Sequence, residues 1–136
     1  IKAVTDVLAS GHISQGEKVK EFETGLARFV GTKYGVAVSS GTSAIHVALK
    51  GLDVGTGDEV ILPSYVCAGP YMAILHSGAI PKRVDVDASD FNISATAVKK
   101  ALTAKTKAII VPHMFGTPAE LDELLDLGIP ILEDGA

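Results

Sequence analysis

Residues 36–49 read VAVSSGTSAIHVAL, and this stretch decides how the rest of the chain is interpreted. The apolar run 36–38 predicts a short buried strand. The small, hydroxyl-rich residues 39–43 predict a tight turn. Beyond the turn, apolar residues recur at i, i+3, i+4 and i+7 along one face of a helix: Ile45, Ala48, Leu49 and Leu52. The stretch therefore predicts a strand, a turn and the N-terminus of a helix.

Such a helix N-terminus suits a phosphate group. The first N–H groups of a helix have no partner within it, and the helix dipole is positive at that end. Gly41 lets a ligand approach the backbone closely, and the neighbouring hydroxyls supply further donors. The same residues also suit a capped helix that follows a strand, a common feature of α/β proteins. This pattern alone leaves both interpretations open.

Composition excludes several classes of function. The chain has 136 residues, which suits one domain, and its hydrophobic fraction of 47% is enough for a substantial core. The net charge is −4 with no basic cluster, which argues against nucleic acid as a partner. A single cysteine excludes an intramolecular disulfide and a multi-cysteine metal site. No run reaches transmembrane length and no signal peptide is visible, so we expect a cytoplasmic protein. We also expect no bound metal.

The order of elements predicts an α/β fold. Apolar periodicity and turn residues predict helices over 2–10, 17–30 and 66–77, one after the turn at 39–43, one capped by Ser94, and one that starts at a capping box over 117–120. Largely apolar runs predict strands over 36–38, 59–62, 107–111 and 129–132, and another strand is expected over 79–86. Strands that are continuously apolar and separated by helices indicate a parallel sheet covered on both faces.

Ligands of such sheets bind beyond the carboxyl ends of the strands, so residues at those positions are the candidates for a site. Asp134 follows the last strand, where its carboxylate suits either a protonated ring nitrogen or the N-cap of a following helix. Cys67 lies beside the expected pocket and suits either that pocket or an ordinary small buried position. His113 follows a strand and suits either ligand orientation and acid–base chemistry or hydrogen bonds to a loop.

A series of short motifs resembles the DegT/DnrJ/EryC1/StrS family of pyridoxal-phosphate (PLP) sugar aminotransferases. The matching residues stand in the same order across nearly the whole chain: Gly16 with 19–23, then 39–44, 57–61 with Pro63, 78–79 with Pro81, 84–87, 106–110, 113–116, and 133–134 with Ala136. One such motif is weak evidence, whereas the ordered series is highly specific.

The resemblance implies a three-layer parallel-sheet sandwich, the type I PLP-dependent transferase fold. Residues 1–136 would be the N-terminal part of its large domain, with the C-terminal small domain absent. Gly41, Thr42 and Ser43 match the segment that binds the cofactor phosphate, and Asp134 matches the aspartate that pairs with the pyridine nitrogen. The family reaction moves an amino group, with glutamate as donor, to a keto group of a nucleotide-linked sugar for polysaccharide or other glycoconjugate synthesis. A homodimer is expected.

The sequence departs from the family pattern at three points. Cys67 stands where an aromatic ring usually lies against the cofactor, and Gly135 stands where alanine is usual. The lysine that forms the Schiff base would lie beyond Ala136, so the resemblance implies no catalytic residue in this chain and no turnover by it alone. Two alternatives stay open: a sugar dehydratase of the same family with histidine in place of that lysine, or a truncated, inactive PLP-fold module.

Overall fold

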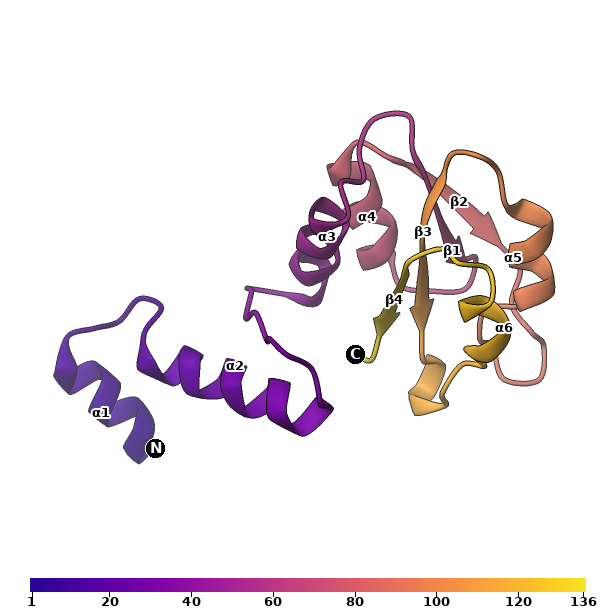
Figure 1. The fold of residues 1–136 in the computed structure, drawn as a ribbon. Helices are drawn as coiled ribbons and strands as arrows, with labels where there is room; N and C mark the ends of the chain where they lie inside the picture. Colours follow the sequence, from indigo (N-terminus) through magenta and orange to yellow (C-terminus); the bar gives the residue numbers. More distant parts are fainter. The chain divides into compact units, whose positions relative to one another are not determined.

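The computed structural model describes residues 1–136 as two compact units, Ile1–Val38 and Ser39–Ala136 (Figure 1). The first unit holds α1 (Lys2–Ser10) and α2 (Glu17–Val30), as the sequence predicts. Gly11 and Gly31 follow them with φ of 71° and 81°. A residue with a side chain is strained in this left-handed region, which explains why glycine ends both helices.

The strand predicted over 36–38 is absent, and that prediction is wrong. Val36 is 73% exposed, and no residue of this run belongs to the sheet. The backbone N–H of Ala37 donates instead to the Glu23 carboxylate on α2, at 2.8 Å. An apolar run forms a strand only where another strand accepts its backbone hydrogen bonds, and here a side chain takes that place.

The second unit contains a four-stranded parallel sheet in the order β2-β1-β3-β4. Its elements are α3 (Gly41–Gly51), β1 (Glu59–Pro63), α4 (Ala68–Ser77), β2 (Ile80–Val84), α5 (Ala95–Ala101), β3 (Thr106–Pro112), the short 3₁₀ helix η1 (Met114–Gly116), α6 (Asp122–Leu125) and β4 (Ile131–Asp134). The prediction of an α/β fold with a parallel sheet is confirmed.

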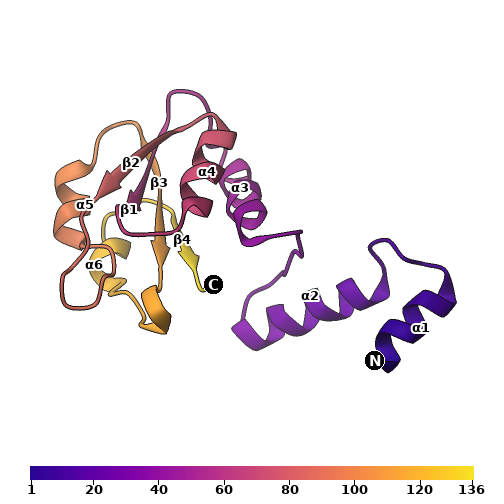
Figure 2. The same cartoon turned by 180° about the vertical axis from the view of Figure 1, so that it is seen from behind.

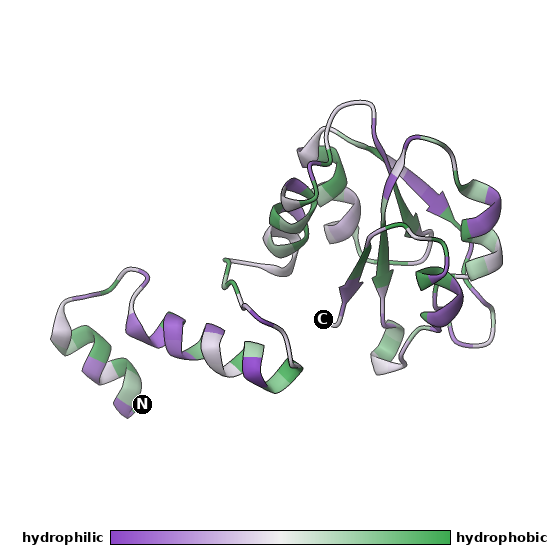
Figure 3. Cartoon of the chain, viewed as in Figure 1, coloured by the Kyte–Doolittle hydropathy of each residue, from purple (hydrophilic) through white to green (hydrophobic).

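Each central strand contributes to a core on both faces of the sheet. Val60 and Leu62 of β1 pack with α3 and α4, whereas Ile61 between them packs with α5 and α6. Residues of β3 alternate in the same way. Figures 1 and 2 show α3 and α4 beside one face and α5 and α6 beside the other. Figure 3 shows β1 and β3 as strongly hydrophobic. Helices therefore cover both faces, which makes three layers.

Of two helix starts predicted from the sequence, one is confirmed and the other is wrong. Ser94 caps α5, since its hydroxyl accepts from the N–H of Ala97 at 3.4 Å. The capping box over 117–120 does not form, and α6 begins only at Asp122. The carbonyls of Thr117 and Pro118 accept instead from the Asn92 side chain, which holds this segment as a loop.

No helix in this structure is both long enough and apolar enough to cross a membrane.

Candidate cofactor site at the carboxyl edge of the sheet

The four parallel strands end at one edge of the sheet, and α3 and α4 start at that edge (Figure 1). The turn before α3 is built from serines. Ser40 is the N-cap, and its hydroxyl accepts from the N–H of Ser43 at 3.1 Å. The Ser43 hydroxyl lies 3.0 Å from that of Ser40. These bonds place Gly41, Thr42 and Ser43 in the first turn of the helix. The N–H of Ser43 is taken by the cap, which leaves the N–H groups of Gly41 and Thr42 free for a ligand.

Thr42 and Cys67 lie close together across the packed pair α3 and α4. A Cβ atom on Gly69 would be 2.9 Å from Thr42 Oγ1 and 3.6 Å from Cys67 Sγ. The first distance is too short for real atoms, so Gly69 leaves the room that the Thr42 hydroxyl occupies. The structure therefore joins two residues that are 25 positions apart (67 − 42) and that the sequence singled out separately.

The electrostatics at these two helix starts favour an anion. Neither helix carries an acidic residue in its first turn. Cys67 is the N-cap of α4 and makes no side-chain capping hydrogen bond. No carboxylate in its own first turn therefore compensates the positive end of either dipole. A phosphate group fits this arrangement because it accepts from backbone N–H groups and from the Thr42 hydroxyl.

Asp134 is the last residue of β4 and lies at the same edge of the sheet. Its Oδ1 accepts from the N–H of Ala136 at 3.2 Å. Its backbone carbonyl accepts from the N–H of His113 at 3.0 Å, which ties it to the end of β3. Glu133, one residue earlier, reaches the His113 ring instead. The two carboxylates of this strand end therefore have different partners.

Both ring nitrogens of His113 are occupied by contacts within the protein. Nδ1 accepts from the N–H of Ala119 at 3.0 Å, and Nε2 lies 3.1 Å from a Glu133 carboxylate oxygen. A general acid or base needs a ring nitrogen that faces the substrate. In this arrangement His113 makes the loop hydrogen bonds that its position in the sequence allowed, and its role toward a ligand stays a prediction.

Sequence reasoning did not identify Gly69 or Asn92. Gly69 lies in the first turn of a helix, where glycine is unfavourable unless the position needs it. Asn92 is the only asparagine of the chain and is 2% exposed. Neither residue belongs to a motif that carries a known chemistry, so only the packing of separate segments shows what they contact.

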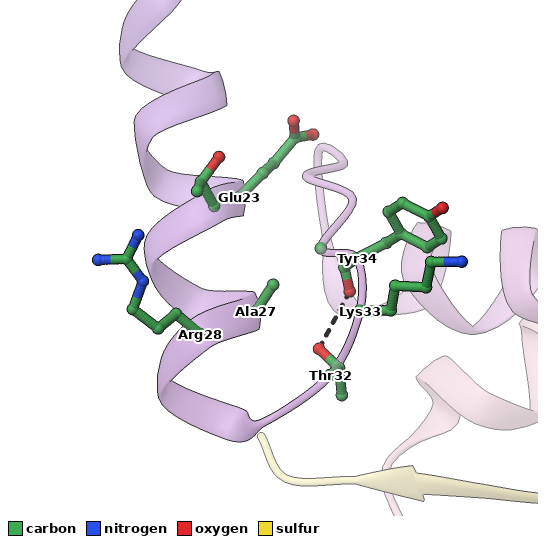
Figure 4. Close-up of a pocket in the computed structure, with 8 residues that line it drawn as sticks. Glu23, Ala27, Arg28, Thr32, Lys33 and Tyr34 are labelled. Atoms are coloured by element: carbon green, nitrogen blue, oxygen red, sulfur yellow. Dashed lines mark hydrogen bonds between the residues drawn. The ribbon is translucent and has the colours of Figure 1, made fainter.

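A separate surface pocket of about 380 Å³ lies in the first unit, between α2 and the segment after it (Figure 4). Its lining includes Glu23, Arg28 and Tyr34, and the Thr32 hydroxyl donates to the Tyr34 carbonyl at 3.1 Å. None of the residues that the sequence singles out for a cofactor lines this pocket. The pocket therefore does not bear on the site at the sheet edge.

Comparison with known proteins places the whole chain in one family. The model of the DegT/DnrJ/EryC1/StrS aminotransferase family matches residues 1–136. The chain belongs to this family. The resemblance inferred from the sequence motifs is thereby confirmed, over the full length of the chain.

Solved structures of DegT/DnrJ/EryC1/StrS relatives agree with this assignment. The aminotransferase from Psychrobacter cryohalolentis is 34% identical with a TM-score of 0.91, and the match covers 97% of this chain and 35% of that one. NtdA from Bacillus subtilis, solved with the cofactor PMP, is 30% identical with a TM-score of 0.92, and the match covers 97% and 31%. GDP-4-keto-6-deoxy-D-mannose-3-dehydratase from E. coli, solved with hydrated PLP, is 35% identical with a TM-score of 0.89, and the match covers 98% and 37%.

Two facts follow from these matches. The fold is that of PLP-dependent transferase large domains, as the sequence predicted. The chain spans about a third of the length of the relatives that it matches.

Proposed function

We propose that this chain forms the N-terminal part of the large domain of a PLP-dependent sugar aminotransferase. The observation that carries the proposal is the convergence of Thr42, Cys67 and Gly69 at the starts of α3 and α4. Family membership supports it, because matched relatives were solved with PLP or PMP bound. In this proposal the chain binds and orients the cofactor.

The first turn of α3 would hold the cofactor phosphate. Gly41 and Thr42 would donate backbone N–H groups, and Thr42 would add its hydroxyl. Ser43, whose N–H is held by Ser40, would offer its hydroxyl. The Cβ of Gly41 would meet no atom within 4 Å, so the space above this turn is open to a ligand. Cys67 would lie beside the cofactor ring as a small group, and a stacking contact by an aromatic residue at this position is missing.

Asp134 would face the pyridine nitrogen of the cofactor. One of its oxygens is engaged with the N–H of Ala136, which fixes the orientation of the carboxylate. A carboxylate at this place forms a charge-assisted hydrogen bond to a protonated ring nitrogen and keeps the proton there. The bound cofactor supplies an electron sink for a carbanion on the substrate, and the ring-nitrogen proton strengthens that sink.

The remaining parts of the proposed reaction lie outside residues 1–136. We propose a nucleotide-linked keto sugar as amino acceptor, glutamate as donor, a lysine beyond residue 136 as the group that moves the proton, and a cytoplasmic homodimer as the working form. The reaction step at the substrate would need that lysine.

The test of the proposal is cofactor binding by the full gene product, measured by equilibrium dialysis with PLP. We expect Thr42→Ala to weaken binding on the order of tenfold, because a hydrogen bond to a charged phosphate is lost. Thr96→Ala, at an exposed position of α5, is the matched control and should change nothing. PLP affinity that is undetectable, or unaffected by both Thr42→Ala and Asp134→Asn, contradicts the proposal.

A second candidate is a sugar dehydratase of the same family, which the 35% identity to GDP-4-keto-6-deoxy-D-mannose-3-dehydratase supports. The two candidates would share the phosphate and ring-nitrogen contacts described above. The coding sequence after codon 136 distinguishes them: a lysine just past a later strand supports the aminotransferase, and a histidine at that place supports the dehydratase. A stop codon there would favour an inactive binding module.

A further inference from the structure

Asn92 is a buried amide that joins two loops at the carboxyl edge of the sheet. It is 2% exposed and belongs to the loop between β2 and α5. Its Nδ2 donates to the carbonyl of Thr117 at 3.2 Å and to Asp90 Oδ2 at 2.9 Å. Its Oδ1 accepts from the N–H of Met114 at 3.0 Å. The Pro118 carbonyl, at 3.5 Å from Nδ2, is a fourth partner. Four partners for one buried side chain indicate that the loop between β3 and α6 depends on this residue.

That loop has a backbone that needs such support. Phe115 has φ of 55°, in the left-handed region that residues with a side chain rarely adopt. Such conformations persist where the surrounding contacts determine them. Met114 and Thr117 flank Phe115, and both are hydrogen-bonded to Asn92. Asn92 therefore holds the turn that follows His113.

This turn, which Asn92 holds, fixes the orientation of the His113 ring. Because Nδ1 accepts from the N–H of Ala119, it carries no proton, and the proton of the neutral ring is on Nε2. Nε2–H then donates to Glu133 across 3.1 Å. The protein thus selects one tautomer of His113, and it connects the end of β3 with the end of β4.

The backbone of His113 completes the connection to Asp134. Its N–H donates to the Asp134 carbonyl at 3.0 Å, at the end of the β3–β4 pairing, where Pro112 lies opposite Asp134. A rotation of the chain at residue 113 would therefore move the residue whose carboxylate is proposed to face the cofactor ring. The hydrogen bond with the N–H of Ala136 is the only one that the Asp134 side chain itself makes.

We infer that Asn92 and His113 are positioning residues that set the orientation of Asp134 toward a protonated ring nitrogen. His113 acts in its Nε2–H tautomer and does not itself exchange protons with substrate. The inference rests on the proposed function for the role of Asp134, and it adds the two residues on which that role depends.

The first experiment needs no cofactor. In ¹⁵N spectra of the ligand-free protein, the His113 ring should show the Nε2–H tautomer. Asn92→Asp keeps an acceptor for Met114 but loses both amide donors, so amide hydrogen exchange at His113 should become faster. Ser89→Ala, in the same loop and exposed, is the control and should leave this exchange unchanged. The Nδ1–H tautomer, or unchanged exchange in Asn92→Asp, overturns the inference even where PLP binds well.

The second experiment measures PLP binding by the full gene product and the pH titration of the ¹⁵N chemical shift of the ring nitrogen in bound, ¹⁵N-labelled PLP, which reports the ring-nitrogen proton. His113→Ala should weaken binding on the order of tenfold and move this titration, whereas His113→Asn, which restores an acceptor near Nδ1, should recover part of both. His76→Asn, at the exposed C-terminal end of α4, is the control. A change in affinity without a change in the titration overturns the inference.

A double-mutant cycle tests whether His113 acts through Asp134, separately from whether the protein binds PLP. If His113 acts through Asp134, His113→Ala should have little further effect on PLP affinity in an Asp134→Asn background. An equal effect in both backgrounds overturns the inference and leaves the proposed function intact. Wild-type protein without PLP affinity overturns the proposed function, and the cofactor part of the inference with it, even where the tautomer is as expected.

Discussion

The two compact units of this chain use similar apolar patterns with different results. In Ser39–Ala136, apolar residues of the strands and helices form two buried clusters, one on each face of the sheet. In Ile1–Val38, Ala27 is the only buried residue. The α2 residues Phe22, Leu26 and Phe29 are 59%, 44% and 89% exposed, although their spacing is that of an amphipathic helix.

This difference teaches what periodicity does and does not determine. The spacing of apolar residues fixes which face of a helix can be buried, and a second element must then cover that face. The helices α3 and α4 meet this condition, because they pack against one another and against the sheet. The stability of the chain should therefore come almost entirely from residues 39–136.

The largest expected loss of stability comes from a cavity made in the core beside the sheet. Ile109 is fully buried in β3, and Ile109→Ala should lower the free energy of unfolding by about 2–5 kcal/mol. The matched change Leu26→Ala on α2 should cost less than about 0.5 kcal/mol. Urea unfolding followed by circular dichroism measures both. Equal losses would show that the α2 face is buried in solution, which would remove the difference between the units.

A second comparison uses polar side chains. Asn92→Ala leaves the N–H of Met114 and two loop carbonyls without their partner, so it should cost about 1–3 kcal/mol. Thr32→Ala in the first unit removes one exposed hydrogen bond to Tyr34 and should be close to neutral. The same unfolding measurement checks this pair. A neutral Asn92→Ala would mean that water replaces the lost contacts and that the loop does not depend on the amide.

Most of the sheet unit could be predicted from the sequence. Continuous apolar runs such as 107–111 identified β3, and Gly31 and Ser94 correctly marked the end of α2 and the start of α5. These signals are local, since a cap or a glycine with positive φ acts on its own helix. The run 36–38 is equally apolar, yet its partner for backbone hydrogen bonding is Glu23, 14 residues before Ala37. No local pattern contains that information.

The candidate site was predictable to the same extent. The position of Asp134 follows from the order of strands, because ligands of parallel sheets bind at the carboxyl edge. The turn 39–43 was identified by its hydroxyl residues and the helix after it, since no strand precedes it in the structure. The space that Gly69 leaves for Thr42 depends on how closely α3 and α4 pack. The contacts of Asn92 depend on a loop 25 residues further along the chain. Such contacts between distant segments have no signature in a single sequence.

A smaller effect tests the local signals directly. Ser94→Ala removes the cap of α5 and should cost about 1 kcal/mol. Thr117→Ala should be nearly neutral, since the capping box that its position predicted does not form and α6 begins at Asp122. Thermal unfolding of the two variants under one set of conditions compares them. A larger loss in Thr117→Ala would indicate that α6 starts earlier in solution than this structure shows.

The smallest effect concerns ion pairs, which also differ between the units. Lys18 and Glu21 on α2 are 55% and 61% exposed, whereas Lys82 and Glu59 in the sheet unit are 30% and 17% exposed. The Thr103 hydroxyl, followed by Lys82, holds the pKa of Glu59 below its ordinary value. Because the folded-state pKa is lowered, the ionised Glu59 stabilises the fold at pH values above the ordinary carboxyl pKa.

This stabilisation is lost as the pH falls through the lowered pKa of the folded state. Glu59→Gln should therefore be less stable than the wild type at neutral pH, and the difference should shrink below about pH 4. Glu21→Gln should change stability less at every pH, because water screens its exposed pair. Urea midpoints of the three proteins between acid and neutral pH measure this. A difference between Glu59→Gln and the wild type that does not change with pH would mean that Glu59 stabilises the fold by packing rather than by its charge.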